Sequence, residues 1–138
     1  MMVPVRSLDE VRGLSAGSPN VAALNRACRS VGTECVMASC RETERDEATV
    51  HARVFAPLLD IPEDPAAGSA NGALGAYLVH HSVVPPHRGP TTTIVSEQGA
   101  EMGRPSTVYV EVDHRDGAIT AVRVGGEVVL VVEGVARL

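Results

Sequence analysis

The stretch RVFAPLLDIPEDPAAGSANGALGAYL, from Arg53 to Leu78, decides the fold. A strand-like run ends at Pro57, an acidic proline-containing loop follows, and a segment of small residues opens at Gly68 and Ser69. No Asp, Glu, Lys or Arg occurs from Pro65 to His87. A helix that is apolar or small in every direction is typically surrounded by protein. We therefore expect a buried central helix that begins near Ser69.

Two glycines inside this predicted helix indicate that another element approaches it closely. A glycine in a helix costs roughly 1 kcal/mol relative to alanine, so Gly72 and Gly75 need a compensating contact. A sheet curled around the helix would provide that contact. The stretch therefore predicts an α+β fold in which a twisted, mostly antiparallel sheet or barrel wraps around the central helix.

The start of the same helix carries the clearest chemical pattern in the chain. The first backbone N–H groups of a helix are unpaired and lie at the positive end of its dipole, so a turn through Gly68, Ser69 and Ala70 would bind an anionic group. Asp64 would lie at the rim, where a carboxylate can move a proton on a bound carboxylate-bearing substrate. Spacing alone favours a simpler interpretation, in which Ser69 is an N-cap and Asp64 a turn residue before Pro65.

Length and composition predict one domain over residues 1–138. The chain is long enough for one core and too short for two ordinary domains. Aromatic residues make up only 2% and tryptophan is absent, so the core must be built from Val, Ala, Leu and Ile. The formal net charge of −5 provides no basic surface for nucleic acid, and we expect no nucleic-acid partner.

The chain shows no pattern for secretion, membrane insertion, disulfides or metal binding. Met1 to Arg12 lacks the apolar core of a signal sequence, and no segment is apolar enough to span a membrane, so we expect a cytoplasmic protein. The cysteines are odd in number and lack C-x-x-C spacing, which favours reduced packing residues. The histidines form no H-E-x-x-H motif, and we expect neither a metal nor a cofactor. These residues are Cys28, Cys35, Cys40, His80, His81 and His87.

Before the central stretch, the sequence predicts a strand, a surface helix and two further strands. Val3 to Leu8 is the expected first strand, and Ser18 is expected to cap an amphipathic helix with Pro19 at its first position. That helix would lie on the outside of the sheet, with its apolar residues on one face. They are Val21, Leu24, Cys28 and Val31. The next two strands are expected at Glu34 to Cys40 and Ala48 to Phe55.

Within the second of these strands, His51 and Arg53 fall on the face opposite the core. Such a row can meet a ligand or a partner, or it can simply face solvent. Alternation of this kind is common in half-buried strands, so the solvent-facing interpretation is favoured.

After the central helix, the chain predicts four strands. They are Thr91 to Ser96, Thr107 to Asp113, Ala118 to Val124 and Val128 to Val132. The last is a continuous apolar run of the kind expected for a strand covered on both faces. The loop between the first two contains Arg104, which could be a carboxylate clamp or an ordinary surface cation.

Several spaced motifs match a known family in order. They are RVFAP, EDPAAGSANGALGAYL, IVSEQGAEMGRPS, RVGG and a final VVEG. The chain resembles the PhzF-like family of phenazine biosynthesis, whose relatives include diaminopimelate epimerase. The resemblance runs from about Val3 to Leu138 and covers only the C-terminal half of the family's usual length.

The resemblance implies a fold, an activity and a set of site residues. The family has two similar lobes, each a sheet around a central helix, and its active site lies in the cleft between them. Its best-known member isomerises a dihydro-hydroxyanthranilate by moving a proton. By resemblance Asp64 is the catalytic aspartate, Ser69 contacts the substrate, and the backbone amides at Gly68 and Ala70 bind its carboxylate. Ala67 replaces the family's usual threonine, which leaves the substrate open.

The resemblance also implies a partner. The family's general acid/base glutamate lies in an N-terminal lobe that this sequence does not contain, and none of Glu63, Glu97 and Glu101 matches its position. We therefore expect an isomerase or epimerase-like lobe whose cleft is completed by a second copy in a homodimer or by a separate N-terminal lobe. The alternatives are a non-catalytic module that binds small carboxylates and a truncated remnant of the family.

Overall fold

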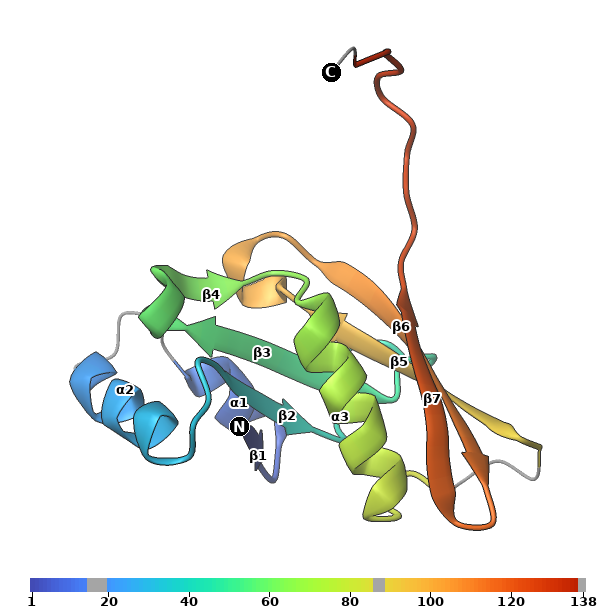
Figure 1. The fold of residues 1–138 in the computed structure, drawn as a ribbon. Coiled ribbons are helices and arrows are strands. Elements are labelled where there is room, and N and C mark those ends of the chain that lie inside the picture. Colours follow the sequence, from blue (N-terminus) through green and yellow to red (C-terminus); the bar gives the residue numbers. More distant parts are fainter. Residues whose placement is uncertain (15–19, 86–88, 137–138) are drawn as a thin grey trace.

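One sheet forms the framework of the protein, whose computed structural model describes residues 1–14, 20–85 and 89–136 (Figure 1). The strand order is β1-β2-β3-β5-β6-β7, with β4 paired to β3. Four of the six pairings are antiparallel, whereas β1 pairs with β2 and β3 with β5 in parallel. The strands are β1 (Met2–Pro4), β2 (Val36–Cys40), β3 (Val50–Ala56), β4 (Ile61–Asp64), β5 (Thr91–Gln98), β6 (Ser106–Arg115) and β7 (Ala118–Gly125). The predicted mixed α+β class is confirmed.

The central helix α3 (Gly68–His80) packs against one face of this sheet (Figure 1). Leu74 and Leu78 are buried in a core that also contains apolar side chains of β2, β3, β5 and β6. The opposite flank of α3 is open, because Ser69, Ala73 and His80 are exposed. The prediction that protein surrounds the helix on every side is therefore wrong for this flank. In the described residues the sheet ends at β7, and no further strand covers it.

The two interior glycines allow β6 and β7 to approach α3. A Cβ added at Gly75 would lie 2.5 Å from Val110 Cγ1, and one at Gly72 would lie 3.1 Å from Val124 Cγ2. Real Cβ atoms do not approach other atoms as closely as 2.5 Å. The prediction of a close contact at these glycines is confirmed.

The N-terminal region contains a helix that the sequence analysis missed. The predicted strand from Val3 to Leu8 is wrong beyond Pro4, where β1 ends, and α1 (Leu8–Gly13) begins at Leu8. Ser7 caps this helix by accepting a hydrogen bond from the Glu10 N–H. A serine three residues before a glutamate is a start signal for a helix, and this signal outweighs the strand pattern.

The predicted surface helix is α2 (Val21–Ser30). The structure assigns its N-cap to Asn20, whose side chain accepts a hydrogen bond from the Ala23 N–H. The predicted cap Ser18 and the predicted first position Pro19 lie outside the described residues. On the expected apolar face Cys28 is buried, but Val31 is exposed.

The last apolar run does not form the predicted strand. Residues 126–136 continue from β7 without joining the sheet and project from the body of the molecule (Figure 1). Val128 to Val132 are 81–92% exposed, whereas the sequence predicted a strand covered on both faces. The prediction is wrong for this chain by itself, because no neighbouring strand is available to the run among the described residues.

No described helix combines the length and the apolar character needed to cross a membrane. Cys28, Cys35 and Cys40 are free thiols, and Cys28 and Cys40 are buried. Burial raises the pKa of the Cys40 thiol, which disfavours the reactive thiolate.

Candidate functional site

The N-terminus of α3 presents unpaired backbone donors. The helix begins at Gly68, and its N-cap, Ala67, makes no side-chain capping bond. Within the described residues, the backbone N–H groups of Gly68, Ser69 and Ala70 donate no hydrogen bond, whereas the Asn71 N–H donates to the Ala67 carbonyl over 3.0 Å. The simpler interpretation of Ser69 as an N-cap is therefore wrong. These donors and the helix dipole together favour an anion.

Asp64 is the last residue of β4 and leads into this helix through a short turn. Its Oδ1 accepts a hydrogen bond from the Ala66 N–H over 2.9 Å. Asp64 is therefore a turn residue, as the simpler interpretation predicted. The bond occupies one side of the carboxylate and leaves other lone pairs for a ligand.

A cavity of about 560 Å³ lies against the start of α3 and the end of β7. Of the predicted site residues, Gly68 lines it, whereas Asp64, Ser69 and Ala70 do not. Ser69 is exposed and Ala70 is buried. The lining residues are Ala66, Gly68, Pro105, Ser106, Thr107, Val108, Val124, Gly125, Gly126 and Glu127. The polar side chains of Ser106 and Thr107, at the start of β6, and of Glu127, just after β7, were missed, because they are distant in sequence from Asp64 and Gly68.

Two buried amides hold the turn that carries Asp64. Asn71 Nδ2 donates to the Ala67 carbonyl over 2.9 Å and to Gln98 Oε1 over 2.8 Å, and Gln98 Nε2 donates to the Asp64 carbonyl. Asn71 and Gln98 are 0% and 1% exposed. A buried amide that lacks a hydrogen-bond partner destabilises the folded protein. These bonds therefore fix the turn in place.

Gly99 brings the next loop against the same turn. It has a φ of +82°, and a Cβ added there would lie 2.4 Å from the Arg104 carbonyl oxygen and 2.8 Å from that of Pro65. Only glycine fits this backbone conformation and this contact. The loop after β5 therefore packs directly on the turn between β4 and α3.

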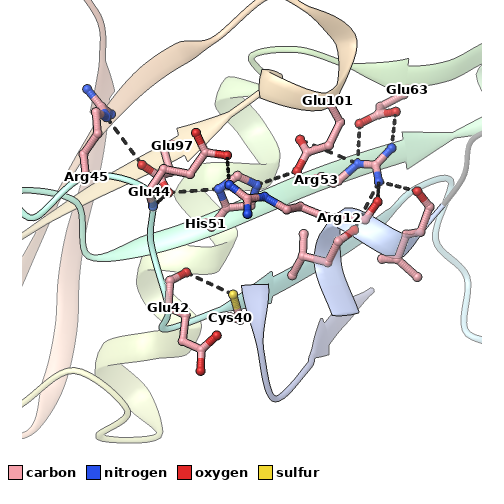
Figure 2. A network of polar contacts seen from close by, with 12 residues as sticks. Arg12, Cys40, Glu42, Glu44, Arg45, His51, Arg53, Glu63, Glu97 and Glu101 are labelled. Carbon is pink, nitrogen blue, oxygen red and sulfur yellow. Dashed lines mark hydrogen bonds and ion pairs between the residues drawn. The ribbon is translucent and has the colours of Figure 1, made fainter. Parts of the chain in front are cut away.

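A charged network lies on the opposite face of the sheet from α3 (Figure 2). His51 is 1% exposed, its Nδ1 is 2.9 Å from Glu97 Oε1, and its Nε2 is 2.8 Å from Glu101 Oε1. Arg53 is also buried. The favoured prediction of a solvent-facing row is therefore wrong, because α1 and the loop after β5 cover these side chains. Strand alternation identifies the face but not what lies over it.

Arg53 ties β4 and α1 to β3. Its Nε and Nη2 donate to the two carboxylate oxygens of Glu63 over 2.7 and 2.8 Å, and its Nη1 donates to the Val11 carbonyl over 3.1 Å (Figure 2). The hydrogen bond with Glu63 raises the pKa of Arg53 although burial opposes the charge. Paired, two-point contacts between arginine and carboxylate are the strong form of this interaction.

Glu97 is held ionised inside the same network. Burial opposes its charge, but hydrogen bonds from the Glu44 N–H at 2.5 Å and from His51 outweigh burial and lower the pKa of Glu97. Successive strand residues point to opposite faces, so Glu97 anchors the network while Gln98 holds the Asp64 turn. The network and the turn are therefore joined through adjacent residues of β5, and likewise through Glu63 and Asp64 of β4.

The described residues contain no group of three His, Cys, Asp or Glu side chains that could hold a metal ion. His80 ends α3 and His81 is its C-cap, at the end of the helix where the dipole favours a positive charge. His87 lies outside the described residues. Arg104 is exposed, and no side-chain contact distinguishes between its two predicted roles.

Comparison with known proteins gives a family and a fold. A family model described as phenazine biosynthesis-like protein, PhzC-PhzF, matches residues 1–134. The chain is 36% identical over 117 residues to the uncharacterised isomerase YddE of Salmonella typhimurium, covering 85% of this chain and 38% of that protein. It is 37% identical over 87 residues to trans-2,3-dihydro-3-hydroxyanthranilate isomerase of Pseudomonas aeruginosa, covering 63% of this chain and 30% of that protein.

Among solved structures, a PhzF-family protein of Bacillus anthracis matches 94% of this chain and 45% of its own, with a TM-score of 0.70 and 22% identity. This likeness concerns the fold. The chain spans about two fifths of the length of curated relatives such as YddE of Salmonella typhimurium and of Escherichia coli.

Proposed function

The chain belongs to the phenazine biosynthesis-like PhzC-PhzF family, and from this premise we propose that it forms one lobe of an isomerase active site. The lobe is of the diaminopimelate epimerase type, and its substrate is a small metabolite that bears a carboxylate. Asp64 moves a proton on that substrate. A second subunit, either another copy or a complementary N-terminal lobe, completes the cleft.

The observation that carries this proposal is the start of α3. Three unpaired N–H groups, at Gly68, Ser69 and Ala70, lie four to six residues after Asp64 on a turn held by buried hydrogen bonds. Backbone donors at a helix start bind a carboxylate without a charged side chain. A fixed carboxylate nearby can then act as general acid or base, a contribution of typically 10²–10⁴ in rate.

The chemistry needs a second proton-transfer group. Isomerisation removes a proton from one carbon and delivers a proton to another, so groups must be held on both sides of the substrate. Glu63, Glu97 and Glu101 lie in the charged network on the opposite face of the sheet from α3, where they contact Arg53 and His51. They are unsuited to this role, which we assign to the second subunit.

The cavity and one relative support the proposed substrate class. About 560 Å³ falls within the range of roughly 300–1,000 Å³ that is usual for small-molecule sites. The relative of Pseudomonas aeruginosa is named for a ring carboxylate, trans-2,3-dihydro-3-hydroxyanthranilate. A ring or chain of similar size with one carboxylate fits both observations.

Solvent deuterium exchange tests the proposal. The native assembly, incubated with trans-2,3-dihydro-3-hydroxyanthranilate in heavy water, should incorporate deuterium into the ligand, as read by mass spectrometry. Asp64→Asn should lower the rate by about 10²–10⁴ because it removes the proton-transfer group. Asp60→Asn is the matched control, since Asp60 is an exposed turn residue just before β4 and its substitution should leave the rate unchanged.

The same experiment separates the alternatives. Binding without exchange in the wild type would contradict the isomerase and favour a non-catalytic carboxylate-binding module. The absence of both ligand binding and deuterium exchange would favour a truncated remnant of the family.

A further inference from the structure

The C-terminal segment, residues 127–135, is an unpartnered apolar strand. Five consecutive large aliphatic residues, Val128 to Val132, are 81–92% exposed, and Val135 is 91% exposed. In the part of the chain that the structure describes, residues 127–136 make no hydrogen bond. Contiguous exposed apolar surface of this kind marks a site of association.

The outer edge of β7 is the matching acceptor. Within the described sheet β7 pairs only with β6, so its other edge presents unpaired backbone N–H and C=O groups. Beside this edge lie the open flank of α3, with Ser69 and Ala73 exposed, and the partly exposed side chains of Val122 and Val124. Small residues on the helix allow another backbone to approach. A strand added at this edge would cover the flank that the sheet leaves open.

Donor and acceptor lie on one continuous strand and have matching lengths. β7 contains eight residues, Ala118–Gly125, and the segment that continues it past Gly126 is an apolar run of similar length. If two such strands run antiparallel about a two-fold axis at Gly126, the segment of each copy lies against β7 of the other. A single symmetry operation then satisfies both exposed edges and both exposed segments.

We propose that two copies of this chain exchange residues 127–135 in this way and form a two-fold dimer. The proposal deepens the proposed function and rests on it for the role of the second subunit. The cavity at the start of α3 is lined by Gly125, Gly126 and Glu127, so it lies next to the axis. The partner's strand would therefore border the cavity and close its open side. A second copy is favoured over other partners because this chain carries both halves of the contact.

The oligomeric state tests the exchange without any ligand. Light scattering on the full chain should give twice the 14.4 kDa of one copy. Leu130→Pro should give a monomer that still unfolds cooperatively and whose circular dichroism spectrum loses only the strand signal of residues 127–135, because residue 130 lies outside the sheet of a single copy and proline removes a donor from the shared ladder. Leu130→Ile is the matched control and should stay dimeric.

A disulfide tests the position of the axis. A Cβ at Gly126 would lie 3.6 Å from the Thr107 carbonyl oxygen, an ordinary contact, so Gly126→Cys is tolerated. Across the axis the two new cysteines fall within the Cα separation that a disulfide requires, and oxidation should link the two copies. Leu59→Cys, an exposed site on another element, should not link them.

A monomeric wild type, a polydisperse aggregate, or a dimer that survives Leu130→Pro and is not linked by Gly126→Cys would each overturn the exchange. Deuterium incorporation in the presence of a different lobe would still be possible after any of these results. The proposed function and the exchanged dimer therefore fail separately.

Discussion

At the scale of single residues, the position of Asp64 depends on adjacent side chains of β4 and β5 that point to opposite faces of the sheet. Glu63 and Glu97 point to the outer face and pair with Arg53 and His51, while Gln98 of β5 donates a hydrogen bond to the carbonyl of Asp64, where the turn before α3 begins. The charged network therefore supports the candidate site through the backbone of β4 and β5. Its ion pairs are buried, so removing one partner leaves an uncompensated group.

Glu97→Gln should destabilise the fold in a pH-dependent manner. The pKa of Glu97 in the folded protein is lower than the 4.5 of the free group. Its contribution to stability is therefore present above pH 4.5 and lost as the pH falls through the folded pKa. At neutral pH the free energy of unfolding should drop by about 1.5–3 kcal/mol, the usual value for a hydrogen bond to a charged group.

Urea unfolding across pH measures this effect. The difference between wild type and Glu97→Gln should shrink at acid pH. Glu47→Gln, at an exposed surface pair with Arg45, should change little at any pH. A Glu97→Gln difference that stays constant from neutral to acid pH would contradict the assignment.

Part of the candidate site could be predicted from the sequence at the residue scale. The position of Asp64 just before a helix with unpaired amides follows from the EDPAAGSA stretch. The burial of His51 and Arg53 could not be predicted, because strand alternation does not reveal that α1 and the loop after β5 cover the outer face. Glu127 of the cavity could not be placed either, since it reaches the start of α3 only through the path of β7.

At the scale of elements, the packing of α3 on β6 and β7 depends on its glycines. Gly75→Ala should lower the free energy of unfolding by about 1–3 kcal/mol, the usual cost of overpacking. The added Cβ would lie 2.5 Å from Val110 Cγ1, and this clash outweighs the gain of up to about 1 kcal/mol from better helix propensity.

Gly72→Ala is the control and should destabilise the protein less than Gly75→Ala. Its neighbour Val124 is 41% exposed and can move aside. Thermal or urea unfolding compares the two variants. A Gly75→Ala protein as stable as Gly72→Ala, or more stable than wild type, would show that β6 does not press on the helix.

Elements were predictable where a long pattern defines them. The strands β2, β3, β5, β6 and β7 and the helices α2 and α3 match the predicted segments to within a few residues at each end. The short β4 was missed because its four residues sit among prolines. The run at Val128 to Val132 was predicted as a strand covered on both faces, and this prediction is wrong: its side chains are 81–92% exposed, and no strand of the described residues pairs with it.

At the scale of the whole molecule, three features without a packing partner among the described residues lie next to one another. The open flank of α3, the unpaired edge of β7 and the exposed residues 127–135 adjoin the cavity at the start of α3. Curated relatives such as YddE are more than twice as long as the matched region. The proposed isomerase lobe, whose cleft is completed by a second subunit, would account for all of these features.

The central claim is that the amide groups at the start of α3 hold the substrate carboxylate, and an NMR titration tests it most directly. With ¹⁵N-labelled protein and 3-hydroxyanthranilate as a stable ligand, we expect saturable shifts of the Gly68, Ser69 and Ala70 amide signals. The amide of Gly117, in the distant hairpin between β6 and β7, should stay still. Saturable binding that leaves the three helix amides unmoved would contradict the account.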